Sequence, residues 1–347
     1  MVVCAILGIR MNKKGFAIII LLLILLTGCK STIDTNEFEL TDESSEEESF
    51  SGETIGELSH GVSWSEDETD YILRYQGGVM KIPYQYCGSG VAKNVGFLIY
   101  INGIAQPYKL EGISDEDKYL QVIEGEDSEL HEFVFSFIPI TGQQGETAEI
   151  CIESVTNPDF KPDLKNDYSY GFSHKTLEAK YDLYFDESVD LDFQQINTKN
   201  RIIEAEVHSD ICTSDIKDSI ISNEEYDLQK EVYFDLIIDG KTALLDEKYD
   251  ITNQNEIEAS MIIFGHPGVT YRVSWYLDHM LLTGSEEEYY DIELLSEKYS
   301  EVKVRIDTSE LDGNTLYVVA VPINADDFPE DSIQTIKTSS IYLFTED

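Results

Sequence analysis

The stretch VGFLIYINGIAQPYKL, residues 95–110, decides the fold that we expect for this chain. One apolar run enters the dipeptide Asn102-Gly103 and a second run leaves it. Asn-Gly between two apolar runs favours a tight β-hairpin, because both residues tolerate a positive φ angle. The stretch therefore predicts two antiparallel strands that turn at Asn102-Gly103.

Short runs of the same kind, separated by turn residues, fill most of the remaining chain. In HEFVFSFIPI, residues 131–140, Phe recurs at every second position, and VTYRVSWYLDHMLL, residues 269–282, alternates in the same way around Trp275. No segment of ten or more residues shows clear helical spacing. This pattern predicts an all-β protein with two tandem β-sandwich domains, residues 58–180 and residues 181–347.

The second of these regions resembles an immunoglobulin-like domain over about 90 residues. Asp312-Gly313 followed by Tyr317 is similar to the corner that precedes strand F in that family, and Trp275 stands where the core Trp of strand C is expected. The paired cysteines of antibody domains are absent. The resemblance implies a sandwich fold with Trp275 in its core.

The composition is strongly acidic, with 68 acidic and 24 basic residues and a net charge of −44. Such a surface repels nucleic acid phosphates, so we expect no nucleic acid partner. A partner held by charge would be a cation, a metal ion or a basic protein. The alternative is a solvated acidic surface that only keeps the protein soluble.

The N-terminal region has the layout of an export signal. In MNKKGFAIIILLLILLTGCK, residues 11–30, Lys13 and Lys14 precede an apolar run at residues 16–26. That run is shorter than the roughly 20 residues that a membrane-spanning helix needs. Residues 1–28 are therefore expected to be a signal peptide, and Met11 is a candidate for the true start.

The end of this region, Leu26-Thr27-Gly28-Cys29, resembles the lipobox of bacterial lipoproteins, with Gram-positive bacteria as the expected source. The resemblance implies a diacylglycerol on the Cys29 sulfur and cleavage before Cys29. Two acyl chains anchor a protein stably, whereas one does so only marginally. We therefore expect a protein attached to the extracellular face of the cell membrane. An ordinary signal peptide with a buried Cys29 is the alternative.

Residues 29–57 are expected to form a disordered acidic tether behind the lipidated Cys29. Between Asp34 and Glu48 there are eight acidic residues and no basic one. Such a segment buries too little apolar surface to offset the entropy of ordering it. Its role would be to hold the sandwiches away from the membrane, or alternatively to attract a basic partner.

Three cysteines remain in the predicted sandwiches, at Cys87, Cys151 and Cys212. Strand alternation places Cys151 with Glu149 and Glu153 on a polar face. A Cys87–Cys151 disulfide is one hypothesis for an exported domain, and free thiols are the other.

Motifs for catalysis or metal binding are missing from the sequence. The six histidines form no zinc pattern, and there is no nucleophile elbow or phosphate-binding loop. The acidic segments at residues 161–171 and 186–193 could offer oxygen ligands to Ca²⁺, but neither fits the twelve-residue EF-hand loop. We therefore expect no catalytic residue, no cofactor and no resident metal.

These observations favour a non-enzymatic, membrane-anchored lipoprotein whose sandwiches bind a surface protein or a glycan, or have a structural role. The alternative is a hydrolase that acts on envelope components or glycans through paired carboxylates. A solute-binding component of a transporter would need alternating strands and helices, which the sequence lacks.

Overall fold

The computed structural model describes residues 56–65, 69–166, 169–171, 173–190, 198–221, 226–242, 247–284 and 288–346. The predicted signal peptide, the lipobox with Cys29 and the predicted tether up to residue 55 lie outside the described residues. Within them, strands dominate, and the α-helix is the short α2 (Ser214–Ile220). The all-β prediction is confirmed.

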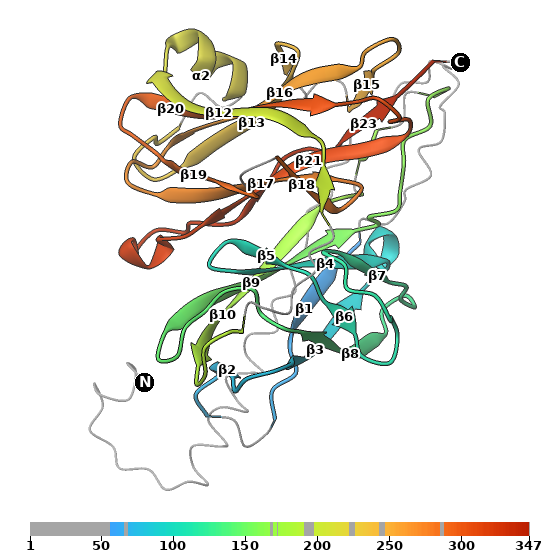
Figure 1. The fold of residues 1–347 in the computed structure, drawn as a ribbon, viewed down its shortest axis with the longest axis vertical. Coiled ribbons are helices and arrows are strands. Elements are labelled where there is room, and N and C mark those ends of the chain that lie inside the picture. The colour runs from blue at the N-terminus through green and yellow to red at the C-terminus, as the bar shows by residue number, and fades with distance from the viewer. Residues whose placement is uncertain are drawn as a thin grey trace, which may run out of the picture. The chain divides into compact units, whose positions relative to one another are not determined.

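The first sandwich consists of two sheets, which we name sheet I and sheet II (Figure 1). Sheet I has the strand order β1 (Leu58–Val62), β3 (Met80–Gly88), β8 (Leu130–Phe137), β6 (Lys109–Leu110). Sheet II has the order β2 (Leu73–Tyr75), β10 (Thr176–Phe185), β9 (Thr147–Thr156), β4 (Val95–Ile101), β5 (Ile104–Gln106), and β7 (Gln121–Ile123) also pairs with β4. Their facing sides enclose an aromatic core that includes Tyr84, Tyr86, Phe97, Phe133 and Phe135.

The predicted hairpin at Asn102-Gly103 joins β4 to β5. Ile101 pairs with Ile104, and the two turn residues have φ angles of 48° and 74°. The Asn102 side-chain oxygen accepts a hydrogen bond from the Glu149 backbone nitrogen at 3.1 Å, which ties the turn to β9. The hairpin prediction is confirmed.

The second sandwich consists of sheets III and IV. Sheet III has the order β11 (Lys199–Asn200), β18 (Met280–Thr283), β17 (Thr270–Leu277), β21 (Asn314–Pro322), β23 (Ile341–Phe344), β15 (Lys248–Asp250), with β19 (Tyr290–Glu293) on β17 and β22 (Ile336–Lys337) on β21. Sheet IV has the order β12 (Ile202–Ile211), β20 (Lys298–Asp307), β16 (Glu256–Gly265), β13 (Val232–Ile238), β14 (Lys241–Thr242).

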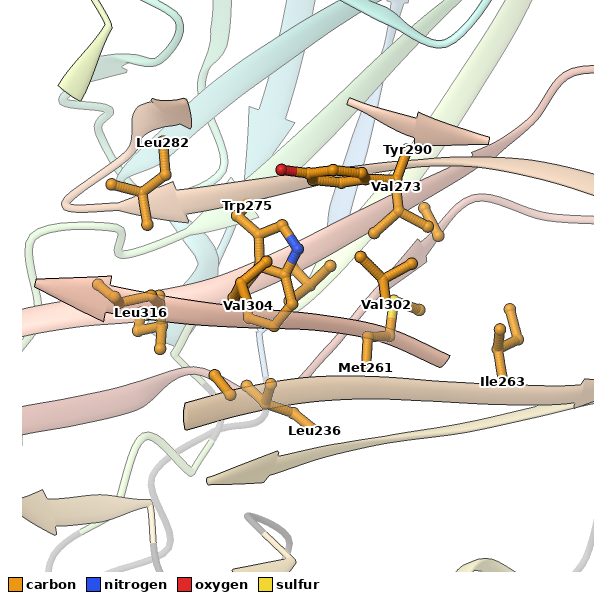
Figure 2. Packing of buried hydrophobic residues seen from close by; sticks show 14 of the residues in the cluster. Leu236, Met261, Ile263, Val273, Trp275, Leu282, Tyr290, Val302, Val304 and Leu316 are labelled. Carbon is orange, nitrogen blue, oxygen red and sulfur yellow. The ribbon is translucent and has the colours of Figure 1, made fainter. Parts of the chain in front are cut away.

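Trp275 lies in the core between sheets III and IV, as the sequence predicts. It is fully buried, and Figure 2 shows it among apolar side chains that include Leu316 from sheet III and Val304 from sheet IV. Strand β17, which carries Trp275, pairs with β21, just as strands C and F share a sheet in immunoglobulin-like domains.

The expected boundary between residues 180 and 181 falls inside β10 and has to be corrected. This strand pairs with β9 from Thr176 to Tyr184. Since the pairing continues without a break, the first sandwich extends to at least Phe185. Residues 52–347 together form one compact unit.

Among the described residues, we find no helix with the length and apolar character required to cross a membrane.

Candidate functional site

The candidate site lies on the face of sheet II that points away from sheet I. Strand pairing places Tyr100 opposite Cys151 and Cys151 opposite Lys180. In the next row, Glu153 lies opposite Glu178. Residues that are directly opposite on neighbouring strands project to the same face, so these side chains form a compact group.

Sheet III covers this face with aromatic and aliphatic side chains. The Tyr100 hydroxyl donates a hydrogen bond to the Tyr276 hydroxyl at 3.0 Å, and the rings of Tyr276 and Tyr317 stack with centroids 5.2 Å apart. Both faces of β4 and of β21 are therefore buried, one in a sandwich core and one in the junction between the sandwiches. The buried apolar residues of this junction are Leu98, Tyr100, Ala105, Tyr119, Leu120, Cys151, Val155, Tyr276, Leu281, Tyr317, Val319 and Val321.

The predicted polar face that carries Cys151 and Glu153 is buried. Their exposed fractions are only 1% and 2%. Alternation along β9 correctly separates the two faces, but it does not reveal that a second sandwich covers the polar one. Tyr317, which the resemblance placed near a strand corner, also belongs to the junction, where its hydroxyl lies 2.9 Å from Nδ1 of His279.

The hypothetical Cys87–Cys151 disulfide is absent, since Cys87, Cys151 and Cys212 are all free thiols. Cys87 belongs to sheet I, where its neighbour Tyr86 points into the sandwich core. Cys151 belongs to sheet II, where its neighbours Ile150 and Ile152 do the same. The two cysteines therefore face away from each other on opposite sides of the first sandwich.

We use the name junction cluster for Cys151, Glu153, Glu178, Lys180 and Lys337. Oε2 of Glu178 accepts a hydrogen bond from the backbone nitrogen of Thr335 at 2.8 Å. The Cys151 sulfur lies 3.3 Å from the Thr335 hydroxyl oxygen and 4.0 Å from the same Glu178 oxygen. Nζ of Lys180 is 3.7 Å from Glu178. Sulfur, carboxylate and ammonium groups thus meet where sheets II and III approach.

Burial shifts the ionisation of this cluster strongly. It raises the pKa of Glu153 to about 8, partly opposed by a hydrogen bond from Thr176, and it raises the pKa of the Cys151 thiol well above its usual value. It also lowers the pKa of Lys337 to about 7, against the attraction of Glu153. Desolvation penalises charge on these three groups, so burial favours the neutral forms of Glu153, Cys151 and Lys337.

Lys337 is held by specific contacts. Its ammonium lies 4.5 Å from the centre of the Tyr317 ring and donates a hydrogen bond to the Ser340 hydroxyl oxygen at 2.9 Å. A cation over an aromatic face is attracted by the ring quadrupole. These contacts hold the Lys337 side chain over the Tyr317 ring of the neighbouring strand β21.

A groove of about 630 Å³ adjoins the cluster. Lys337 of the junction cluster and Thr335, which contacts the cluster, both line the groove. Thr176 of β10 lines it as well. The remaining lining comes from the second sandwich and mixes rings, amides and charges: Lys230, Glu231, Val232, Tyr233, Phe234, Tyr271, Ser332, Ile333, Gln334 and Ile336. Both sandwiches therefore contribute to the groove.

The buried His174 and the half-buried His279 extend the polar part of the junction. Nδ1 of His174 lies 2.9 Å from the Ser340 hydroxyl oxygen, and its Nε2 lies 3.2 Å from the Phe160 carbonyl. His279 likewise has its Nε2 2.8 Å from the Pro158 carbonyl. A carbonyl only accepts, so Nε2 carries the proton in both rings. Both residues have the positive φ of turn residues, and His174 is only 6% exposed.

Of the two acidic segments considered for Ca²⁺, the structure describes residues 161–166 and 169–171 of the first and residues 186–190 of the second. At residues 161–166, Asp163 accepts hydrogen bonds from the Lys165 backbone and the Asn166 amide, and Lys248 donates to the carbonyls of Asp163 and Asn166. The Asp163 carboxylate and the carbonyls of Asp163 and Asn166 therefore already accept hydrogen bonds from protein groups. Residues 191–193 of the other segment lie outside the described residues.

The comparisons with known proteins assign no family. No protein-family model and no curated protein matches the chain. Among solved structures, a complex of Dpr2 Ig1-Ig2 with DIP-Theta Ig1-Ig3 is 9% identical, with 84% of this chain and 100% of that chain covered and a TM-score of 0.22. The C-terminal domain of the AgI/II polypeptide BspA from Streptococcus agalactiae is 10% identical, with 83% and 100% covered and a TM-score of 0.20. Because both TM-scores are low, neither similarity assigns a fold or a function to this chain.

The junction predicts a specific dependence of stability on pH. Burial lowers the pKa of His174 to about 3 from its ordinary value of 6.5. Below pH 6.5 the unfolded chain binds a proton at this residue that the folded chain does not bind. His174 should therefore reduce the free energy of unfolding by about 1.4 kcal/mol for each pH unit between 6.5 and 3, with no such loss above 6.5.

Urea unfolding of the wild type and of His174→Gln between pH 7.5 and pH 4.5 measures this contribution. The difference in stability between the two proteins should change with that slope below pH 6.5, because Glu153 and the other carboxyl groups are common to both. His208→Gln, which replaces an exposed histidine, is the matched control. Parallel pH curves for wild type and His174→Gln would contradict the prediction.

Proposed function

We propose that this protein is a non-enzymatic bacterial lipoprotein, anchored through a diacylglycerol on Cys29, whose two sandwiches bind a glycan at the extracellular face of the cell membrane. The lipobox Leu26-Thr27-Gly28-Cys29 supports the anchor, and the acidic segment behind it would act as a spacer.

The observation that carries the binding role is the groove next to the junction. Its volume of about 630 Å³ lies within the range of roughly 300–1,000 Å³ that is typical of small-molecule sites. Tyr233 offers an aromatic ring, and Ser332, Gln334 and Thr335 offer hydroxyl and amide groups. Sugars bind through this combination of apolar ring contacts and hydrogen bonds.

The connection between the sandwiches also supports a binding role. Sheets II and III share a buried layer, so the two walls of the groove are supported by a common interface. A preformed site loses less entropy on binding than one that must be assembled.

A hydrolase is the second candidate, because Glu153 and Glu178 are directly opposite on β9 and β10 and the pKa of Glu153 is raised to about 8. A protonated carboxylic acid beside a carboxylate is the pair that glycosidases use. However, Glu153 is only 2% exposed, so a polysaccharide could not reach it in this conformation. We therefore favour binding over hydrolysis.

The proposed lipid anchor predicts where the Cys29→Ser variant is found in the cell. Cys29→Ser removes the sulfur that would carry the lipid, so the protein should be released into the medium or remain as the unprocessed precursor. Cell fractionation with immunoblotting measures this, and Cys87→Ser serves as the matched control that should stay in the membrane fraction. Unchanged membrane retention and processing of Cys29→Ser would refute the anchor.

The groove predicts loss of glycan binding in defined variants. Tyr233→Ala should weaken binding to a glycan selected on an array by at least about tenfold, because stacking and its desolvation are lost. Tyr184→Ala, which changes a tyrosine of the first sandwich outside the groove, is the control. Isothermal titration with the selected glycan gives the affinities. Binding that survives Tyr233→Ala, or a ligand found only among surface proteins, would contradict the proposal.

A further inference from the structure

We propose that Cys151, Glu153 and Glu178 form a binding site for a divalent transition-metal ion of the zinc type. One potential ligand atom from each residue lies within 4.8 Å of those from the other two. Zinc accepts thiolate and carboxylate ligands at about 2.0–2.3 Å, so small side-chain rotations would bring these atoms to one ion. This proposal does not rest on the proposed glycan binding, although Thr335 lies beside both sites.

The arrangement follows from strand register. Glu153 and Glu178 are directly opposite on β9 and β10, and Cys151 precedes Glu153 by two residues on the same face. The two neighbouring pairs, Cys151 with Lys180 and Glu153 with Glu178, therefore bring three potential ligands and one lysine together. No short sequence motif predicts such a site, because its ligands come from two different strands, β9 and β10.

An independent observation points to a missing ligand. Oε2 of Glu153 has no hydrogen-bond partner in the described part of the chain, although the residue is only 2% exposed. Leaving a buried carboxylate oxygen unsatisfied is costly, and nearly all such atoms in folded proteins have a partner. A bound cation would supply that partner and offset the cost.

The two nearby lysines have other partners, so they do not prevent the carboxylates from binding a metal ion. Nζ of Lys180 is equally far, at 3.7 Å, from Glu178 and from Glu149, and both separations exceed a normal hydrogen bond. Lys180 can therefore stay paired with Glu149 when Glu178 turns to a metal ion. Lys337 has its own contacts to the Ser340 hydroxyl and the Tyr317 ring.

Thr335 would complete the site. Its backbone nitrogen donates to Glu178 and its hydroxyl oxygen lies 3.3 Å from the Cys151 sulfur. Hydrogen bonds of this kind orient the side chains that bind a metal ion. Thr335 also lines the groove, so the groove reaches the edge of the proposed site. The Cys151 thiol proton leaves to solvent when the sulfur binds the ion.

The ligand chemistry selects the class of metal. Thiolate sulfur favours zinc-type ions, whereas Ca²⁺ and Mg²⁺ prefer oxygen ligands alone. We expect an acidic surface of this charge to attract cations without specificity, so an excess of Mg²⁺ separates that background from the proposed site.

The test uses the full chain, freed of metal with a chelator and titrated with Co²⁺ in excess Mg²⁺. Thiolate ligation gives a charge-transfer absorption in the near ultraviolet, which should saturate at one equivalent. Cys151→Ala should abolish this absorption, and Cys87→Ala and Cys212→Ala, the matched controls, should retain it. No absorption, or an absorption that survives in Cys151→Ala, would overturn the proposal.

Glu153→Gln gives a second measurement that does not depend on the cysteine. The substitution keeps the shape of the side chain and removes its ability to bind an ion as a carboxylate. Zn²⁺ should raise the melting temperature of the wild type, and its affinity should fall at least about tenfold in Glu153→Gln. If Cys151→Ala fails to fold, this comparison decides alone, and equal Zn²⁺ affinity in both proteins rejects the site.

Discussion

Burial of the outer face of sheet II against sheet III is the interaction on which the rest of the structure depends. A β-sandwich normally buries one face of each sheet and leaves the other to solvent. Here β4 and β21 are buried on both faces, and Tyr100, Tyr276 and Tyr317 fill the space between them. The junction excludes water from a region that also contains carboxylates, a thiol and two histidines. Their shifted ionisation follows from that exclusion.

The same burial links the fold to the proposed functions. The groove, the candidate metal ligands and the pH-sensitive His174 all lie at or beside the junction. The groove is lined by residues of both sandwiches, and the candidate ligands on sheet II are covered by the segment around Thr335 of the second sandwich. The chemistry that we propose for this protein therefore depends on the contact between the two sandwiches.

The sequence predicts each sandwich better than it predicts their contact. Alternating apolar residues identify the strands, and Asn102-Gly103 identifies a hairpin, because these signals are local. The covering of Cys151 and Glu153 depends on a strand more than 160 residues away, so it escapes any local pattern. One signal was present: residues 95–101 and 315–321 are nearly continuous apolar runs, which is typical of strands buried on both faces.

The central claim is that the junction makes residues 52–347 one cooperative unit, and the two tryptophans test it directly. Trp64 packs against the core of the first sandwich and Trp275 lies in the core of the second. With fluorotryptophan incorporated, fluorine NMR during a urea titration follows both sandwiches in one sample. The account predicts that both native resonances lose intensity with the same midpoint. A Trp64 resonance that disappears while Trp275 keeps its native signal, or the reverse, would contradict it.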